Sequence, residues 1–240
     1  MGAFTIEGLI ERLERLQACG PIPSDVKRGE VLGILCPRGQ SRKTLVAILM
    51  TILFPVPAFA ETSSLAILGD LGDVRRSMGI IFQDPSLDRA LTGRENLEFH
   101  ARLCCLDDRT RERRISEVIE LFGLAGVTDT VVGICPPTMV RRLEIARAFL
   151  SHPGLLLLAD PTGGLDEPGA RDIRRLLRQL NRERGVTIVF TTHAMADAEE
   201  ICDRVAVVDG GEVVALDTPE TFRAIMTVDD ALALELDDVP

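Results

Sequence analysis

A basic loop between a predicted strand and a predicted helix is the first place where this sequence could do chemistry. Residues 31–35 (VLGIL) are apolar and rich in β-forming residues, which predicts a buried parallel strand, and residues 44–53 have the length of a helix. The loop between them reads Cys36, Pro37, Arg38, Gly39, Gln40, Ser41, Arg42, Lys43 and Thr44. Because backbone amides, a cationic side chain and a hydroxyl in such a loop can hold a phosphate group, we predict a phosphate-binding loop here.

The elements that must position this loop alternate between strands and helices. Further strands are predicted at 63–70, 77–84, 154–158 and 186–193, and helices at 91–122, 139–150 and 166–185. Asp107 and Asp108 should break the helical segment at 91–122 in two, and a hairpin is predicted at 204–220 with Asp209-Gly210-Gly211 as its turn. This alternation predicts an α/β fold with a mostly parallel sheet covered on both sides.

Five segments, in order and spacing, resemble the ATP-binding-cassette (ABC) ATPases, and most closely the drug-exporter type. They are the loop at 36–45, FQDPSLDRALTGRENLEFHARL at 82–103, RRLEIARA at 141–148, LLLLADPTGGLDEPG at 155–169 and TIVFTTHAMADAEEICDRVAVVDGGEVVALDTPE at 187–220. The resemblance covers about residues 5–225. It implies a P-loop NTPase core, an antiparallel N-terminal β subdomain, an inserted helical subdomain at about 84–150, and a short tail at 226–240 that lies outside the domain.

The phosphate loop departs from the pattern of that family, which reads G-P-N-G-A-G-K-T-T-L. Cys36 and Ser41 replace the first and third glycines, Arg42 stands at the lysine position, and Lys43 stands where a hydroxyl should coordinate magnesium. An arginine does not substitute conservatively for lysine, because its guanidinium is bulkier and planar. We therefore expect the binding of both ATP and Mg²⁺ to be weakened.

Three catalytic positions are implied by the resemblance alone. Gln83 would reach magnesium and the attacking water, and His193 would be the switch histidine that contacts the γ-phosphate. Asp160 stands where the family has its catalytic glutamate, and it is one methylene shorter, while Ala159 replaces the aspartate that holds magnesium. Taken singly, Gln83 would be interpreted as a polar surface residue and His193 as a structural one, whereas their places within FQDPSLD and after TIVFTT favour the roles of the family.

The signature loop of the family reads S-G-G-M, and here the aligned residues are Pro136, Pro137, Thr138 and Met139. In the family this loop presents donors to the γ-phosphate held by the partner subunit, and two prolines have no N–H to present. The competing interpretation is a proline start to the helix that follows. Asp166 would lie in the loop that crosses the dimer interface.

Composition excludes several classes of function. The net charge of −10 argues against electrostatic binding of nucleic acid. Trp and Tyr are absent, and Leu13 aligns with the aromatic residue that should stack on adenine, where it would stack poorly. The six cysteines have no C-x-x-C spacing, so reduced thiols are expected. The apolar run at 45–60 contains Pro55 and Pro57 and is too short to span a membrane.

Two functions follow from the resemblance. The first is the cytoplasmic ATP-binding subunit of an exporter, peripheral at the inner face of the membrane, dimerised with itself or with another subunit and docked on separate integral membrane permease subunits. The second is a degenerate paralogue that does not hydrolyse ATP and serves as a structural or regulatory dimer partner. A DNA-repair or translation-factor cassette is disfavoured, because a coiled-coil insertion, a second cassette and a basic surface are all absent from the sequence. The transported substrate is not encoded here, since membrane subunits select it in this family.

Overall fold

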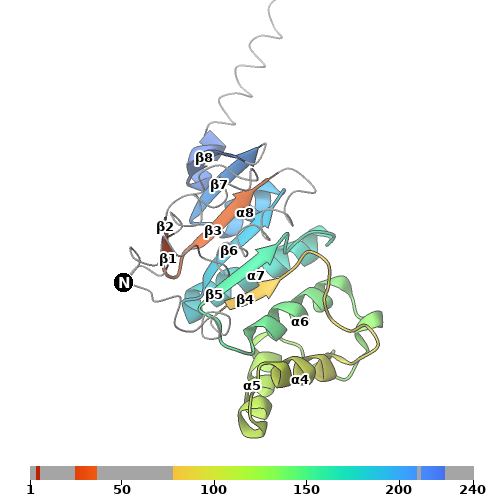
Figure 1. The fold of residues 1–240 in the computed structure, drawn as a ribbon. Coiled ribbons are helices and arrows are strands. Elements are labelled where there is room, and N and C mark those ends of the chain that lie inside the picture. Colours follow the sequence, from red (N-terminus) through yellow and green to blue (C-terminus); the bar gives the residue numbers. More distant parts are fainter. Residues whose placement is uncertain (1–3, 6–24, 37–77, 210–211, 225–240) are drawn as a thin grey trace, which may run out of the picture.

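A mixed six-stranded sheet forms the centre of the molecule (Figure 1). The computed structural model describes residues 4–5, 25–36, 78–209 and 212–224. The strands lie in the order β4-β5-β6-β3-β7-β8. Their bounds are β3 (Val31–Leu35), β4 (Met78–Ile81), β5 (Leu155–Ala159), β6 (Thr187–Thr192), β7 (Arg204–Asp209) and β8 (Glu212–Asp217). All neighbours are parallel except β7 and β8, which form the predicted antiparallel hairpin. A separate antiparallel pair, β1 (Phe4–Thr5) with β2 (Asp25–Val26), belongs to the predicted N-terminal subdomain.

The central strands are buried on both faces, as the apolar runs of β3 and β5 predict. Every residue of β5 and β6 is buried, and β3 is buried except for its last residue. Gly79 of β4 allows close packing, because a Cβ there would lie 2.6 Å from a methyl carbon of Leu156 and 3.1 Å from the carbonyl oxygen of Ala148. The continuous core predicted for a parallel sheet is therefore present.

Helix α7 (Glu167–Arg184) covers one face of the sheet, and its ends are marked in the sequence. Asp166 is its N-cap, and the Asp166 side chain accepts a hydrogen bond from the backbone N–H of Gly169 at 3.0 Å. Gly185 ends the helix in the left-handed region, with φ of 65°. The predicted stop at Gly185 is confirmed. The shorter helix α8 (Met195–Ile201) follows β6 and was not predicted.

Three helices gather beyond the β4 edge of the sheet (Figure 1). They are α4 (Gly93–Leu103), α5 (Asp108–Leu121) and α6 (Pro137–Phe149), and the 3₁₀ turn η2 (Val132–Ile134) precedes α6. The predicted break at Asp107 is confirmed, because the Asp107 side chain caps α5 by accepting a hydrogen bond from the N–H of Thr110 at 3.0 Å. The rings of Phe122 and Phe149 meet edge to face within their core, with centroids 5.7 Å apart.

Several expectations fall outside the described residues. These are the loop residues 37–44, the helix at 44–53, the apolar run at 45–60, the strand at 63–70, the adenine contact at Leu13 and the tail at 226–240. Within the described part, the five cysteines form no disulfide. In the same part of the chain, no helix is both long enough and apolar enough to cross a bilayer.

His100 on α4 should make the stability of the helical region depend on pH. Burial, together with the nearby charge of Arg147, lowers the pKa of His100 from 6.5 to about 4. An Arg147 guanidinium nitrogen lies 3.4 Å from Nδ1 of His100, so protonation would place two cations side by side. Because the unfolded chain binds this proton more readily, stability is complete above pH 6.5 and is lost as the pH falls toward 4.

We expect this one group to remove about 2–3 kcal/mol of unfolding free energy between those pH values. Urea unfolding of the natural chain and of His100→Gln at pH 7, 5.5 and 4.5 measures the effect. The difference in unfolding free energy between the two chains removes the contribution of the carboxylates, because both chains contain the same ones. The unfolding free energy of the natural chain should fall relative to that of His100→Gln as the pH falls. If the unfolding free energies of the two chains changed by the same amount between pH 7 and 4.5, His100 would not resist protonation in the folded state.

Candidate functional site

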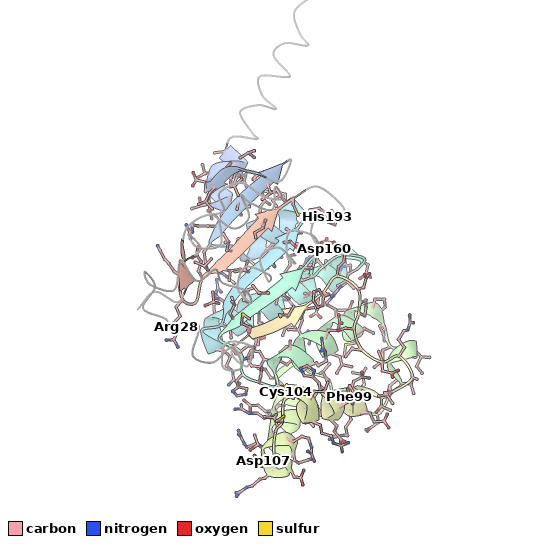
Figure 2. All side chains as sticks on the ribbon, in the orientation of Figure 1. Arg28, Phe99, Cys104, Asp107, Asp160 and His193 are labelled. Carbon is pink, nitrogen blue, oxygen red and sulfur yellow. The ribbon has the colours of Figure 1, made fainter. Side chains whose placement is uncertain are left out.

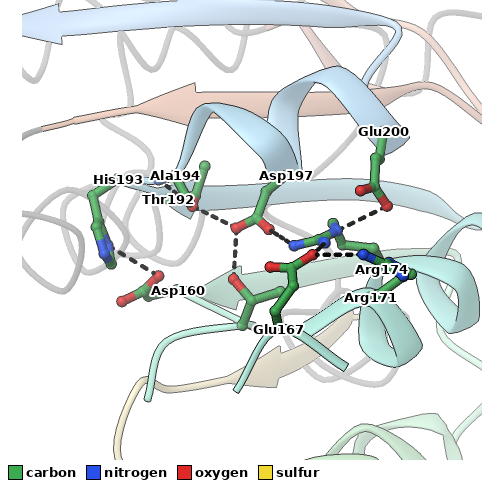
Figure 3. Close-up of polar contacts among 10 residues, drawn as sticks. Asp160, Glu167, Arg171, Arg174, Thr192, His193, Ala194, Asp197 and Glu200 are labelled. Atoms are coloured by element: carbon green, nitrogen blue, oxygen red, sulfur yellow. Dashed lines mark hydrogen bonds and ion pairs between the residues drawn. The ribbon is translucent and has the colours of Figure 1, made fainter. Parts of the chain in front are cut away.

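The carboxyl ends of the parallel strands bring together the residues that sequence analysis singled out. Asp160 follows β5 and His193 follows β6 (Figure 2). Cys36 follows β3. Nδ1 of His193 lies 3.4 Å from Oδ1 of Asp160, and the two side chains face each other (Figure 3). The backbone N–H of Cys36 donates to the carbonyl oxygen of Thr192 at 2.9 Å, so the segment predicted to bind phosphate begins beside the strand end that carries His193.

Asp160 is held in an unusual backbone conformation. Its φ is 48°, in the left-handed region that few residues other than glycine adopt, and only 3% of its surface is exposed. Its N–H donates to the carbonyl oxygen of Thr191 at 2.8 Å, and its own carbonyl accepts from the N–H of Gly163 at 3.0 Å. A Cβ on Gly163 would lie 2.6 Å from Cγ of Asp160, so glycine makes room for the carboxylate. Strain of this kind is concentrated at functional sites.

Ala159 is the last residue of β5 and is fully buried. Its methyl group offers no ligand for a metal or for a metal-bound water. Among the residues that the structure describes, no group of three or more His, Cys, Asp and Glu side chains could hold a metal ion. These residues alone therefore do not fit a complete magnesium site, and whatever ligands the loop at 37–44 supplies lie outside them.

The loop that carries Gln83 is fastened to helix α6. Gln83 itself is exposed, but Arg141 of α6 donates to the carbonyl oxygens of Phe82 and Gln83, both at 2.9 Å. Arg141 also pairs with Glu144 at 3.1 Å, and Glu144 accepts from the N–H of Ser86 at 2.6 Å. Burial of Glu144 raises its pKa, which these contacts partly offset. The loop after β4 and helix α6 are thus linked by a buried ion pair.

The four residues at the signature position form the start of α6. Pro136 is the N-cap and makes no side-chain cap, while Pro137 is the first helical residue. The N–H groups of Met139 and Val140 both donate to the carbonyl oxygen of Pro136, at 2.9 and 3.0 Å. Thr138 packs against Gly169 in the first turn of α7. The interpretation as a proline start to a helix is confirmed, and a role for this loop toward nucleotide remains a prediction.

A buried carboxylate that sequence reasoning missed lies behind Asp160 and His193 (Figure 3). Asp197 of α8 is completely buried. Its Oδ2 accepts hydrogen bonds from the hydroxyls of Thr162 and Thr192, both at 2.6 Å. Thr162 lies two residues after Asp160, and Thr192 directly precedes His193. Asp197 therefore fixes the two loops that carry the candidate catalytic side chains.

The charge of Asp197 is balanced by Arg174 of α7. Arg174 is 2% exposed, and its guanidinium contacts Asp197 at 3.1 Å, Glu167 at 2.7 Å and Glu200 at 2.8 Å (Figure 3). Burial disfavours the charged guanidinium, but the hydrogen bonds to Glu200, Asp197 and Glu167 outweigh it and raise the pKa of Arg174. In the sequence the pair is visible only as an acidic residue shortly after β6 and a basic residue on the preceding helix, and this pattern does not show that either side chain is buried.

Comparison with known proteins places this arrangement among ATP-binding subunits. The family model described as ABC transporter matches residues 20–163. The daunorubicin resistance ATP-binding protein DrrA3 of Streptomyces coeruleorubidus is 34% identical over 222 residues, which cover 92% of this chain and 70% of that protein. A fluoroquinolones export ATP-binding protein of Mycobacterium tuberculosis is 38% identical over 198 residues, covering 82% of this chain and 64% of that protein. The solved structure of cbiO1 from Clostridium perfringens, part of an ABC transporter complex, is 26% identical with a TM-score of 0.72, over 92% of this chain and 89% of that one.

Proposed function

The chain belongs to the ABC transporter family, and on that premise we propose that it is the ATP-binding subunit of an exporter. It would couple the binding and hydrolysis of ATP to the export of a substrate through a separate membrane permease. The observation that carries the proposal is the meeting of Asp160 and His193 at 3.4 Å on the carboxyl edge of a sheet with the cassette fold. Relatives named for daunorubicin resistance and for fluoroquinolone export support an exported drug as the class of substrate.

ATP is the proposed cofactor, with Mg²⁺ as its accompanying ion. We assign phosphate binding to the loop Cys36–Thr44, the γ-phosphate contact to His193, polarisation of water to Asp160 and a contact with magnesium to Gln83. Asp160 suits its role because it is buried beside an imidazole, where a carboxylate can accept a proton from water. The imidazole of His193 keeps part of its surface exposed at the edge of the sheet, where it can meet a phosphate oxygen.

A degenerate subunit that binds ATP without turning it over is the second candidate, and two observations favour it. Buried Ala159 cannot organise a metal-bound water. Pro136 and Pro137 at the start of α6 have no N–H to offer the nucleotide of a partner subunit. In the family, each ATP lies between the phosphate loop of one subunit and the signature loop of the other. A homodimer of this chain would have two altered sites, and a heterodimer with an intact partner would leave neither site complete.

The proposed partners are integral membrane permease subunits and a second ATP-binding subunit, either a copy of this chain or a different one. The chain would then work in the cytoplasm, peripheral at the inner face of the membrane. We propose residues 1–225 as the nucleotide-binding domain, with a helical subdomain at about 84–150. The fastening of the Gln83 loop to α6 by Arg141 would let the permease-facing loop move together with that subdomain.

Weak, nearly magnesium-independent binding of ATP is the expected result of the loop substitutions. The family's glycines, lysine and hydroxyl hold the phosphates through charge-assisted hydrogen bonds, and the absence of each should cost about 1–3 kcal/mol of binding free energy. Calorimetric titration of the full chain with ATP, with and without Mg²⁺, measures this. The variant carrying Arg42→Lys and Lys43→Thr is the matched control and should bind ATP more tightly and respond to Mg²⁺. Tight, magnesium-dependent binding by the natural chain would contradict the assigned weakness of this loop.

A further inference from the structure

Helix α7 carries a row of arginines that the proposed function does not use. Arg171, Arg174, Arg175, Arg178 and Arg182 line one cavity of about 670 Å³. Their spacings of three and four residues place them along one side of the helix. Helix α8 forms the opposite wall through Glu200 and Ile201. Such a concentration of positive charge stands out in a chain whose net charge is −10.

Two of these arginines are neutralised within the fold. Arg174 is surrounded by the carboxylates of Glu167, Asp197 and Glu200. Arg178 contacts a carboxylate oxygen of Asp203 and the carbonyl oxygen of Ile201, both at 3.1 Å. Through these contacts Arg174 and Arg178 hold α7 against α8. They line the cavity, but their charges are already paired within the protein.

The other three arginines remain available to a ligand. Arg175 and Arg182 are exposed, and neither makes a hydrogen bond or an ion pair with any residue that the structure describes. Arg171 touches Glu167 at 3.4 Å, but both side chains are 60% exposed, and an exposed pair of this kind contributes little. Three guanidinium groups therefore face solvent along one groove, and among the residues that the structure describes none of the three has a strong partner; the charge of Arg175 acts on Asp172 only as a minor cause of its lowered pKa, behind the hydrogen bond from Arg142.

The shape of the row selects the kind of anion. Arg171 and Arg182 are eleven residues apart, which corresponds to about 16 Å along the helix axis at 1.5 Å per residue. A single phosphate group cannot reach both ends. A nucleic acid would bring a continuous line of phosphates, which Glu183 and Glu200 in the same groove would repel. A peptide can place its carboxylates opposite the arginines and leave the two glutamates unopposed, and guanidinium groups bind carboxylates through paired hydrogen bonds.

We propose that this groove between α7 and α8 docks an acidic segment of a partner protein, with its carboxylates on Arg171, Arg175 and Arg182. The surface is connected to the candidate site, because Asp166, the N-cap of α7, ends the loop that begins after Asp160. Arg174 in the base of the groove also contacts Asp197, which holds Thr162 and Thr192 (Figure 3). A protein bound here adjoins the network behind Asp160 and His193, and its docking does not require ATP.

A fluorescein-labelled decapeptide in which glutamate alternates with serine is a suitable probe for the full-length chain, because its carboxylates are spaced, and fluorescence anisotropy is the measurement. We expect binding that weakens as salt is raised, because exposed ion pairs are screened. The double variant Arg175→Glu with Arg182→Glu should weaken the peptide affinity by about tenfold or more, as expected when close charge pairs are reversed. The matched control, Arg109→Glu with Arg113→Glu on exposed positions of α5, makes the same change in net charge and should keep the affinity within about twofold.

Four results would overturn the proposal. The first is no binding of the peptide at low salt. The second is an equal loss of affinity in both double variants, which would reduce the effect to net charge. The third is tighter binding of a single-stranded oligonucleotide of the same charge to the same groove. The last is peptide binding that arises only after Asp229, Asp230, Glu235, Asp237 and Asp238 are changed to amides, which would make this chain its own ligand.

Discussion

Replacing Asp197 with alanine should destabilise the folded chain by about 3–5 kcal/mol, because the change leaves the buried guanidinium of Arg174 short of a counter-charge. The hydroxyls of Thr162 and Thr192 would lose their common acceptor at the same time. Arg174 is 2% exposed, so water cannot replace the missing carboxylate. Chemical unfolding in urea, followed by circular dichroism, measures the loss.

Two variants make this test specific. Asp108→Ala removes a carboxylate that is 92% exposed and bonded to Arg111, and it should cost less than about 1 kcal/mol. Asp197→Asn keeps the shape and one acceptor oxygen, so its cost should lie between the other two. If Asp197→Ala unfolded at the same urea concentration as Asp108→Ala, the buried network would not be the link between the two loops that its geometry indicates.

Restoring the phosphate loop alone should leave ATP turnover near background. Arg42→Lys with Lys43→Thr repairs the cation and the magnesium hydroxyl, but Ala159 and the Pro136-Pro137 loop remain. Each missing donor or metal-organising group in such a site typically costs on the order of 10²–10³ in rate. Steady-state phosphate release by the full-length chain should therefore rise by less than about tenfold for the two-residue variant, because its gain is confined to binding.

The combined variant should recover turnover by on the order of 10² or more over the natural chain, because the chemistry then regains its electrostatic stabilisation. It adds Ser41→Gly, Ala159→Asp, Asp160→Glu, Pro136→Ser and Pro137→Gly to the two changes above. The matched control carries Asp160→Gln in place of Asp160→Glu and should lose the gain. Family-like turnover from the two loop changes alone would mean that Ala159 and the prolines matter less than proposed here.

The sequence by itself determined the elements and their order, because the signals for these are local. Short apolar runs indicated the parallel strands, and apolar residues at spacings of three and four indicated the helices between them. Asp107 predicted the break between α4 and α5, since a capping side chain acts on N–H groups within three residues of it. Gly185 predicted the end of α7 for a similar reason, because a glycine tolerates the left-handed conformation that ends a helix. The motif spacing also singled out Asp160 and His193 as candidate site residues, each directly after a predicted strand, whereas their contact is seen only in the structure.

Only the tertiary structure decided how the candidate site is supported. Asp197 joins Thr162, which is 35 residues away in the sequence, and Arg174, which is 23 residues away. No local pattern distinguishes such a buried carboxylate from an exposed one on a short helix. The arginines of α7 illustrate the same limit, since their regular spacing is visible in the sequence but their partners are not. Packing of α8 against α7 encloses Arg174 among three carboxylates and leaves Arg175 and Arg182 in solvent. Burial and charge pairing depend on which distant segments meet, and that is settled when the sheet and its helices assemble.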